Sequence, residues 1–303
     1  MPEHLDAVAG LLAALCWAIG GLAFSRIPAG VGAINFGKNL IGSGLLAAVL
    51  LASPRGFAGI AGAGAEPLLW LAASAVIGIL IGDSSSLRAM QTIGVRRAMV
   101  LSTLSPVFAA AAGWFLLAEL LGAGELLGIA LTLLGVTAVI RERGGEGAPA
   151  GAPAPAASRP LSGVLHGVNG ALCQAVGAAL TKMGMAGGLP PLEASLIRLA
   201  IAAAAGVAFA LVAKRARRWL SELTAPGIPA RMVLASAIGT FLGIWLSLIA
   251  LDALPVAIAS TQTSTTPIFG TILVALLLGE KVSARAWIGT VIAVAGVAAL
   301  FLA

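Results

Sequence analysis

The sequence has 303 residues, of which 59% are hydrophobic and only 10% are charged, and its mean hydropathy is +1.04. This composition excludes a water-soluble globular domain, because apolar runs near twenty residues long are typical of helices that cross a bilayer. The net charge of +6 is therefore not a sign of nucleic-acid binding, since membrane proteins keep basic residues in the loops between spans.

Apolar segments recur along the chain and predict an all-α integral membrane protein with ten transmembrane helices. Each segment has about the ~20 residues that a bilayer core requires. The first is kept as structure, because Glu3 and Asp6 precede it without a basic residue, unlike a signal peptide. The predicted spans are 8–26, 32–52, 68–88, 96–117, 122–140, 161–183, 193–213, 231–252, 257–278 and 284–302.

The two halves of the chain carry the same pattern, which indicates a duplication. Residues 1–140 form the first predicted half and residues 161–303 the second. Residues 141–160 are rich in Ala, Pro and Gly and are interpreted as a flexible linker. A shift of 161 residues superposes eight identical pairs: Gly78/Gly239, Gly82/Gly243, Ala89/Ala250, Ala98/Ala259, Pro106/Pro267, Glu119/Glu280, Gly128/Gly289 and Gly135/Gly296.

Five spans in each half is an odd number, so the two halves enter the membrane in opposite senses. The sequence therefore predicts two inverted five-helix repeats, an architecture that many secondary transporters use for alternating access. The fourth span of each half contains a proline, Pro106 or Pro267. Proline lacks a backbone donor, so a helix bend is expected there, where hydroxyl and amide side chains can bond the freed carbonyl.

Segments 78–140 and 239–302 resemble the EamA repeat of the drug/metabolite transporter superfamily. The shared features are the proline of the fourth helix, a run of small and aliphatic residues, a closing glutamate and a fifth helix with spaced glycines. The resemblance implies ten helices, a central cavity between the halves and export of small metabolites such as amino acids or their relatives. It also implies that both termini lie in the cytoplasm.

The distribution of basic residues predicts the opposite orientation. Of the 18 Lys and Arg residues, fourteen fall on the side of the linker, and only Arg55 and Lys182 fall on the side of the termini. Lys38 and Arg198 lie within spans. Because basic loops stay in the cytoplasm, the charge count predicts a multi-pass protein of the inner cell membrane with both termini outside the cytoplasm.

Three ionisable residues within spans are candidates for a substrate site, because charge inside a membrane is rarely kept without a function. Lys38 and Asp83 lie at similar depth from the basic side, and we expect them to form an ion pair. Arg198 occupies the repeat-equivalent position of Lys38, but the repeat mate of Asp83 is Ile244. We therefore expect an unpaired Arg198 nearer the other side, able to hold a carboxylate or phosphate. Alternatively, Lys38 and Arg198 snorkel to the interface.

Polar side chains gather in the first four helices of each half and are nearly absent from the fifth, which predicts a cavity lined by those eight helices. The alternative is that single Ser and Thr residues bond back to their own helix. Trp245 stacks on a substrate or guanidinium in the first interpretation, and is a packing aromatic in the second. The further candidate substrate-binding residues are Asn35, Asn169, Gln174, Trp245, Gln262 and Thr265.

These features favour a secondary active transporter that exports a small polar or anionic, amino-acid-like metabolite, driven by a proton or sodium ion. No metal constellation and no phosphate-binding glycine loop is present, so no cofactor, ATPase or other enzyme activity is expected. Multidrug or cationic-compound efflux is the alternative within transport, although span one has no Asp or Glu for a cation. A lipid scramblase or a membrane enzyme is the alternative from another class.

Overall fold

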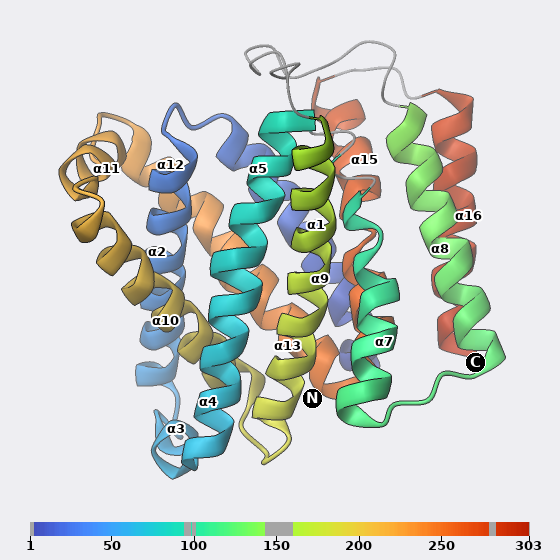
Figure 1. The fold of residues 1–303 in the computed structure, drawn as a ribbon, viewed down its shortest axis with the longest axis horizontal. Helices are drawn as coiled ribbons and strands as arrows, with labels where there is room; N and C mark the ends of the chain where they lie inside the picture. The colour runs from blue at the N-terminus through green and yellow to red at the C-terminus, as the bar shows by residue number, and fades with distance from the viewer. Residues whose placement is uncertain (1–2, 94–97, 99–100, 143–159, 279–282, 303) are drawn as a thin grey trace.

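The computed structural model describes residues 3–93, 98, 101–142, 160–278 and 283–302, and in these residues the chain is helical with no strand (Figure 1). The linker residues 143–159 and Glu280 lie outside the described residues. The helices of the first half are α1 (Glu3–Ser25), α2 (Val31–Ala52), α3 (Ala58–Gly62), α4 (Ala65–Ser74), η1 (Ala75–Gly82), α5 (Asp83–Ile93), α7 (Ser105–Leu117) and α8 (Ala123–Glu142). The helices of the second half are α9 (Pro160–Met185), α10 (Pro191–Val212), α11 (Ala216–Leu223), α12 (Ile228–Ala235), η2 (Ser236–Leu242), α13 (Gly243–Ala253), α14 (Val256–Thr263), α15 (Thr266–Leu278) and α16 (Ala284–Leu302).

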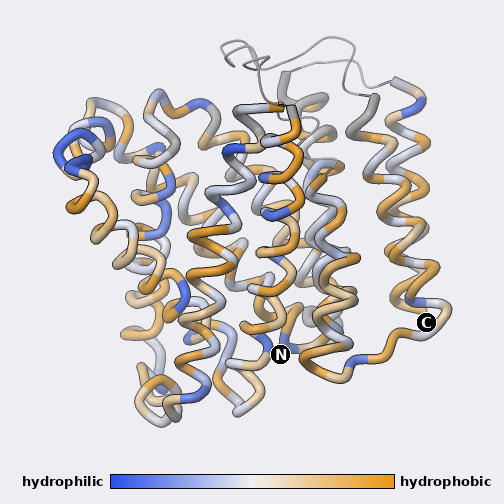
Figure 2. The backbone as a smooth tube through the Cα atoms, in the orientation of Figure 1, coloured by the Kyte–Doolittle hydropathy of each residue, from blue (hydrophilic) through white to orange (hydrophobic). Residues whose placement is uncertain are grey.

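Six of the described helices are long and apolar enough to cross a membrane. Three shorter apolar helices accompany them, and many large aliphatic side chains are exposed. Hydrophobic residues occur along most of the helices (Figure 2). An apolar outer surface is what a lipid environment requires. The six long helices cover 32–52, 65–86, 161–185, 191–212, 228–253 and 284–302, and the shorter ones cover 8–24, 105–117 and 123–139.

The helices of the first half recur in the second at a nearly constant shift. The pair α7 and α15 and the pair α8 and α16 begin 161 residues apart. The third span of each half contains a stretch of π-helix, η1 in one and η2 in the other, which also begin 161 residues apart. A π-helical stretch widens the turn of a helix and is often found at functional sites. The duplication seen in the sequence therefore extends to irregular features of the backbone.

Each first helix packs against the third span of the opposite half. α1 contacts η2 and α13, whereas α9 contacts η1 and α5. Glycines allow both approaches: a Cβ added to Gly20 would lie 2.5 Å from Gly239 Cα, and one added to Gly177 would lie 2.8 Å from Gly78 Cα. Small residues at such crossings let helix backbones approach closely. The two halves are thus interleaved across their interface.

We expect Gly177→Ala to destabilise the protein, because the new Cβ would meet the backbone of η1, which cannot move aside as a side chain can. Overpacking of this kind typically costs about 1–3 kcal/mol. Gly44 of α2 is the matched control, since a Cβ added there meets nothing within 4 Å. Thermal unfolding in detergent should show a lower midpoint for Gly177→Ala and an unchanged midpoint for Gly44→Ala. Equal midpoints for the two variants would mean that the backbones at Gly78 and Gly177 are not closely packed.

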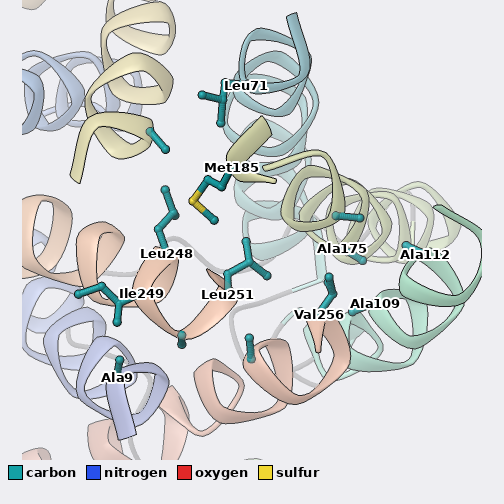
Figure 3. Close-up of a cluster of buried hydrophobic side chains, with 14 of the residues drawn as sticks. Ala9, Leu71, Ala109, Ala112, Ala175, Met185, Leu248, Ile249, Leu251 and Val256 are labelled. Carbon is teal, nitrogen blue, oxygen red and sulfur yellow. The ribbon is translucent and has the colours of Figure 1, made fainter. Parts of the chain in front are cut away.

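The largest buried apolar cluster joins the two halves (Figure 3). Leu71 of α4 and Met185 of α9 meet Leu248 and Leu251 of α13, and Val256 of α14 packs beside Ala109 and Ala112 of α7. A second seam joins α8 and α16 at one edge of the bundle, where a Cβ on Gly135 would lie 2.5 Å from the carbonyl oxygen of Gly289. The two chain ends are marked at the same end of the bundle, and α11 lies at the opposite end (Figure 1).

Candidate functional site

Lys38 and Asp83 form an ion pair within the bundle. Lys38 Nζ of α2 lies 3.3 Å from Asp83 Oδ2, the first residue of α5. About a quarter of each side chain is exposed, 23% for Lys38 and 27% for Asp83. Asp83 directly follows η1, so the π-helical stretch sets the angle at which its carboxylate leaves the helix. The pair expected from the sequence is therefore present and is accessible to a small solute.

The other carboxylate oxygen of Asp83 is held by the second half. Gln174 Nε2 of α9 donates a hydrogen bond of 2.9 Å to Asp83 Oδ1, and the Gln174 side chain is exposed. Farther toward the start of α9, Asn169 Nδ2 donates a 2.9 Å bond to Ser85 Oγ of α5. Asp83 therefore lies between an amine from its own half and an amide from the other, and a polar seam follows the α5–α9 contact.

Arg198 of α10 belongs to the same cluster. A Cβ added to Gly78 of η1 would lie 3.5 Å from Arg198 Nη2, and the guanidinium interacts electrostatically with Asp83. Arg198 Nε is buried and has no hydrogen-bond partner among the described residues. Among the described residues Arg198 forms no ion pair, although Asp83 of the first half acts on it electrostatically. α2 and α10 are repeat mates that pack together, and both of their basic residues approach the same carboxylate.

The equivalent corner of the other half is apolar. Gln174 corresponds to Trp17 in the matching strings 14–20 and 171–177, and Asp83 corresponds to Ile244. Trp17 fills this corner: a Cβ on Gly243 would lie 2.5 Å from its Nε1, whereas the mate Gly82 faces Gln174 Nε2. Lys38 and Arg198 are thus repeat mates within one cluster, whereas Asp83 and Gln174 have the apolar mates Ile244 and Trp17. One site, rather than two, is built from the duplicated fold.

The helix containing Pro267 is interrupted directly before it. α14 ends at Thr263, α15 begins at Thr266, and Pro267 is the second residue of α15. Pro106 is likewise the second residue of α7, and the turn before it lies 161 residues before the turn at 264–265. Thr265, in that turn, is buried and donates a 2.6 Å bond to the carbonyl of Gln262. Pro267 leaves the carbonyl of Thr263 without its backbone donor, and Thr266 Oγ1 donates a 2.7 Å hydrogen bond to that carbonyl.

The remaining predicted residues lie outside the polar cluster. Gln262 is fully buried and its side chain packs against Gly10 of α1. Trp245 of α13 is half-buried, and its ring faces Phe241 with centroids 6.0 Å apart. Asn35 of α2 is half-buried. The structure therefore brings together four of the nine predicted binding residues, with Asn169 nearby.

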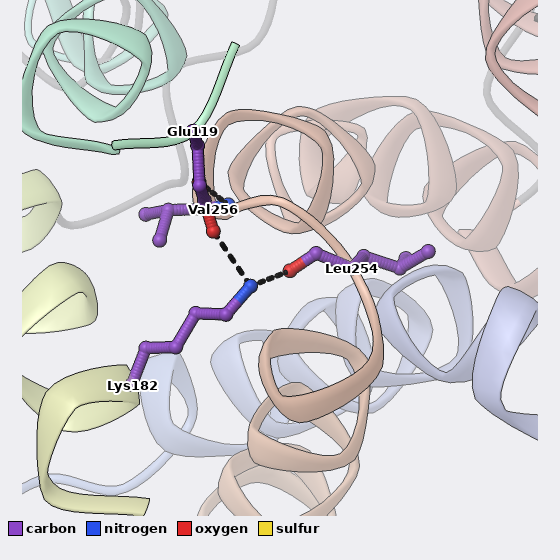
Figure 4. A network of polar contacts seen from close by, with 4 residues as sticks. All are labelled: Glu119, Lys182, Leu254 and Val256. Carbon is purple, nitrogen blue, oxygen red and sulfur yellow. Dashed lines mark hydrogen bonds and ion pairs between the residues drawn. The ribbon is translucent and has the colours of Figure 1, made fainter. Parts of the chain in front are cut away.

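A second polar network, which the sequence analysis did not anticipate, closes the end of the bundle where the termini lie (Figure 4). Lys182 Nζ of α9 lies 2.7 Å from Glu119 Oε1 and 2.5 Å from the carbonyl oxygen of Leu254. Glu119 Oε2 accepts the backbone N–H of Val256 at 2.8 Å. The pair thereby bonds backbone groups at the end of α13 and the start of α14, which have no partner within their helices. It ties three segments together.

The chain positions Glu119 with a strained turn. α7 ends at Leu117, the next residue Ala118 adopts a left-handed conformation with φ 54°, and the N–H of Glu119 then bonds the carbonyl of Gly113 at 3.1 Å. A left-handed alanine costs about 1–2 kcal/mol. Gly113 leaves room for the carboxylate, since a Cβ there would lie 2.6 Å from Glu119 Oε2. The only sequence signal for this arrangement is the repetition of the glutamate at 280, preceded by Gly279.

No group of three or more His, Cys, Asp or Glu side chains is placed to hold a metal ion among the residues described. The free thiols of Cys16 and Cys173 are on different helices, and Cys173 packs against Gly82. The chemistry of the Lys38, Asp83, Gln174 and Arg198 cluster is therefore that of two cationic groups, one carboxylate and an amide donor.

Comparison with known proteins shows the family and the fold of the chain. The model of the EamA-like transporter family matches residues 5–141 and 161–302. No curated protein matches the chain. A solved structure, titled only "Crystal structure of protein", is similar over 98% of this chain and 97% of its own, with a TM-score of 0.73 and 17% sequence identity. That likeness concerns the fold. Because the family model covers both halves, the chain belongs to the EamA-like transporter family, as its resemblance to the drug/metabolite transporter superfamily indicates.

Proposed function

We propose that this membrane transporter is a secondary active carrier that exports a small polar or anionic, amino-acid-like metabolite by alternating access. Its ten spans form two inverted five-helix halves, and the substrate site is the cluster of Lys38, Asp83, Gln174 and Arg198. A proton or sodium ion provides the driving force. No nucleic acid or cofactor takes part.

The observation that supports this proposal most strongly is the charge of the cluster. Two cationic side chains approach a single carboxylate, so one positive charge is in excess in a cluster where Arg198 Nε is buried. A solute carboxylate at Arg198 would neutralise it, and Arg198 Nε is an unused donor there. The ammonium group of a zwitterion would in turn find Asp83. A cationic drug would meet an excess of like charge, which disfavours multidrug efflux.

Alternating access also needs an end that closes. The Glu119–Lys182 network supports a closed conformation at the terminal end, because it bridges Glu119 of the first half to α9 and to the turn between α13 and α14 in the second half. Opening that end would separate segments that belong to opposite halves. We propose that the network breaks and reforms once in each transport cycle.

Solute counterflow in vesicles tests the proposal. Purified protein is reconstituted into vesicles loaded with an unlabelled compound, and entry of the labelled compound is followed. The panel contains neutral, acidic and basic amino acids, simple carboxylates and one lipophilic cation. Transient accumulation of an amino acid or carboxylate is expected, since only a carrier exchanges solutes in this way. Accumulation of the cation alone would favour multidrug efflux, and flipping of labelled phospholipid without solute exchange would favour a scramblase.

The orientation of the carrier is tested separately. From the bias of basic residues we expect both termini outside the cytoplasm, and the two chain ends do lie at one end of the bundle. A reporter that is active only in the cytoplasm should therefore be inactive when fused after Ala303 and active when inserted in the linker 141–160. The opposite pair of outcomes would restore the orientation usual in the family.

A further inference from the structure

A short amphipathic helix lies at the end of the bundle away from the termini. α11 connects α10 to α12 and carries a dense group of hydrophilic residues (Figures 1 and 2). Four basic residues occur within five positions, Lys214, Arg215, Arg217 and Arg218, and all four are exposed. We define these four residues as the α11 basic patch. The patch does not take part in the proposed substrate site.

The buried face of α11 is fixed to the bundle. Trp219 is only 9% exposed and lies between Phe36 of α2 and Phe209 of α10, with ring centroids 6.0 and 6.1 Å away. Gly32 leaves room for the indole, because a Cβ there would lie 2.6 Å from it. α11 is therefore held in a defined orientation, and its basic residues face away from the bundle.

A hydrogen-bonded carboxylate completes this attachment. Glu222 Oε2 accepts the N–H of Gly30 at 2.8 Å, at the start of α2, and Glu222 Oε1 accepts from Arg218 Nε at 2.8 Å. Both bonds hold the pKa of Glu222 below its ordinary value, so the carboxylate stays ionised. Glu222 neutralises Arg218, whereas Lys214, Arg215 and Arg217 have no carboxylate bonded to them in the described structure.

Apolar side chains surround the basic patch. Leu220 is 60% exposed on α11 itself, and Val212 is 85% exposed at the end of α10. An arrangement of arginines beside outward-facing aliphatic residues, at the end of membrane-length helices, is typical of a helix that lies in the headgroup region of a bilayer. The exposed cations then stand at the depth of lipid phosphates.

We propose that the α11 basic patch is a binding site for anionic phospholipid headgroups, with Lys214, Arg215 and Arg217 contacting the lipid phosphate and Leu220 the acyl chains. The charge complementarity is direct, because exposed Lys and Arg side chains near a membrane surface attract anionic lipid headgroups. Through Trp219 and Glu222, a bound lipid would stabilise the position of α2, the helix that carries Lys38.

Lipid titration of the full chain in detergent, followed by native mass spectrometry, tests the proposal. The probes are phosphatidylglycerol and phosphatidylcholine with identical acyl chains. The wild type should bind its first molecule of phosphatidylglycerol at least about tenfold more tightly than its first molecule of phosphatidylcholine. This preference should weaken as the concentration of ammonium acetate is raised. The variant Lys214→Asn/Arg215→Gln/Arg217→Gln should lose the preference; Asn is chosen because Lys214 has a positive φ of 53°.

Two control variants keep the test specific. Arg55→Gln/Arg88→Gln/Arg285→Gln removes the same charge from scattered exposed positions and should keep the preference. Arg215→Lys/Arg217→Lys keeps the charge of the patch and should also keep it. Equal binding of both lipids by the wild type would overturn the proposal, as would equal losses in the two triple variants. Complete displacement of the lipid by inorganic phosphate would also overturn the proposal, because the patch would then bind free phosphate and not lipid. None of these results depends on the transported solute.

Discussion

Asp83→Ala is expected to abolish transport and to destabilise the protein by about 3 kcal/mol. The carboxylate is the one acid shared by Lys38 and Arg198, so its removal leaves two cations without their counter-charge. Breaking a buried ion pair costs about 3–5 kcal/mol, and the lower end applies because a quarter of each side chain is exposed. Unfolding in detergent and counterflow in vesicles measure the two effects.

A double-mutant cycle separates the ion pair from other effects of the substitution. Lys38→Ala/Asp83→Ala should be more stable than Asp83→Ala, because it removes a cation that the single variant leaves unpaired. Ser84→Ala, at the exposed neighbouring position of α5, is the control and should behave as the wild type. If the two single substitutions simply add, Lys38 and Asp83 do not stabilise each other.

Glu119→Ala is expected to have the second large effect, a loss of about 3 kcal/mol. Its carboxylate neutralises Lys182 and also accepts the N–H of Val256, so one substitution leaves both groups unbonded. Glu119→Gln should be milder, since the amide oxygen can still accept from Val256. Lys182→Met, which keeps the apolar stem, should recover part of the stability when combined with Glu119→Gln.

Glu66 is the matched control for Glu119, because it is an exposed acid bonded only to Trp70 of its own helix, at 3.3 Å. Glu66→Ala should change the unfolding midpoint little. If Glu119→Ala changed the unfolding midpoint as little but raised the accessibility of the terminal end to thiol reagents, the network would act as a gate and contribute little to stability. If it changed neither stability nor accessibility, the network would hold nothing together.

The sequence predicts the helical membrane fold and the recurrence of its elements, because apolar length and the 161-residue repeat are properties of the chain itself. The span predicted at 284–302 is observed as Ala284–Leu302, and the breaks before Pro106 and Pro267 fall where the missing donors place them. The Lys38–Asp83 contact could be anticipated because depth in a membrane can be counted along each helix at about 1.5 Å per residue.

The direction in which a side chain points around its helix axis is harder to predict. Most differences between the predicted and the observed contacts arise from it. Nothing in the sequence shows that Arg198 turns toward Gly78, or that Gln174 reaches Asp83, because both depend on how α9 and α10 pack against η1 and α5. The π-helical stretches shift the azimuth further, since each adds a wider turn within a span. The sequence indicates Lys182 only as a loop charge, because its partners, Glu119 and the carbonyl of Leu254, come from distant segments.

The measurement that tests the central claim most directly is counterflow by Arg198→Lys and Arg198→Ala beside the wild type, with the compound that the wild type exchanges. A point ammonium cannot reproduce the two-bond contact of a guanidinium with a carboxylate, so Arg198→Lys should lose at least about tenfold in apparent affinity. Arg198→Ala should show no exchange, although it is expressed and folded. Wild-type affinity in Arg198→Lys, with full exchange by Arg198→Ala, would contradict a substrate site at this cluster.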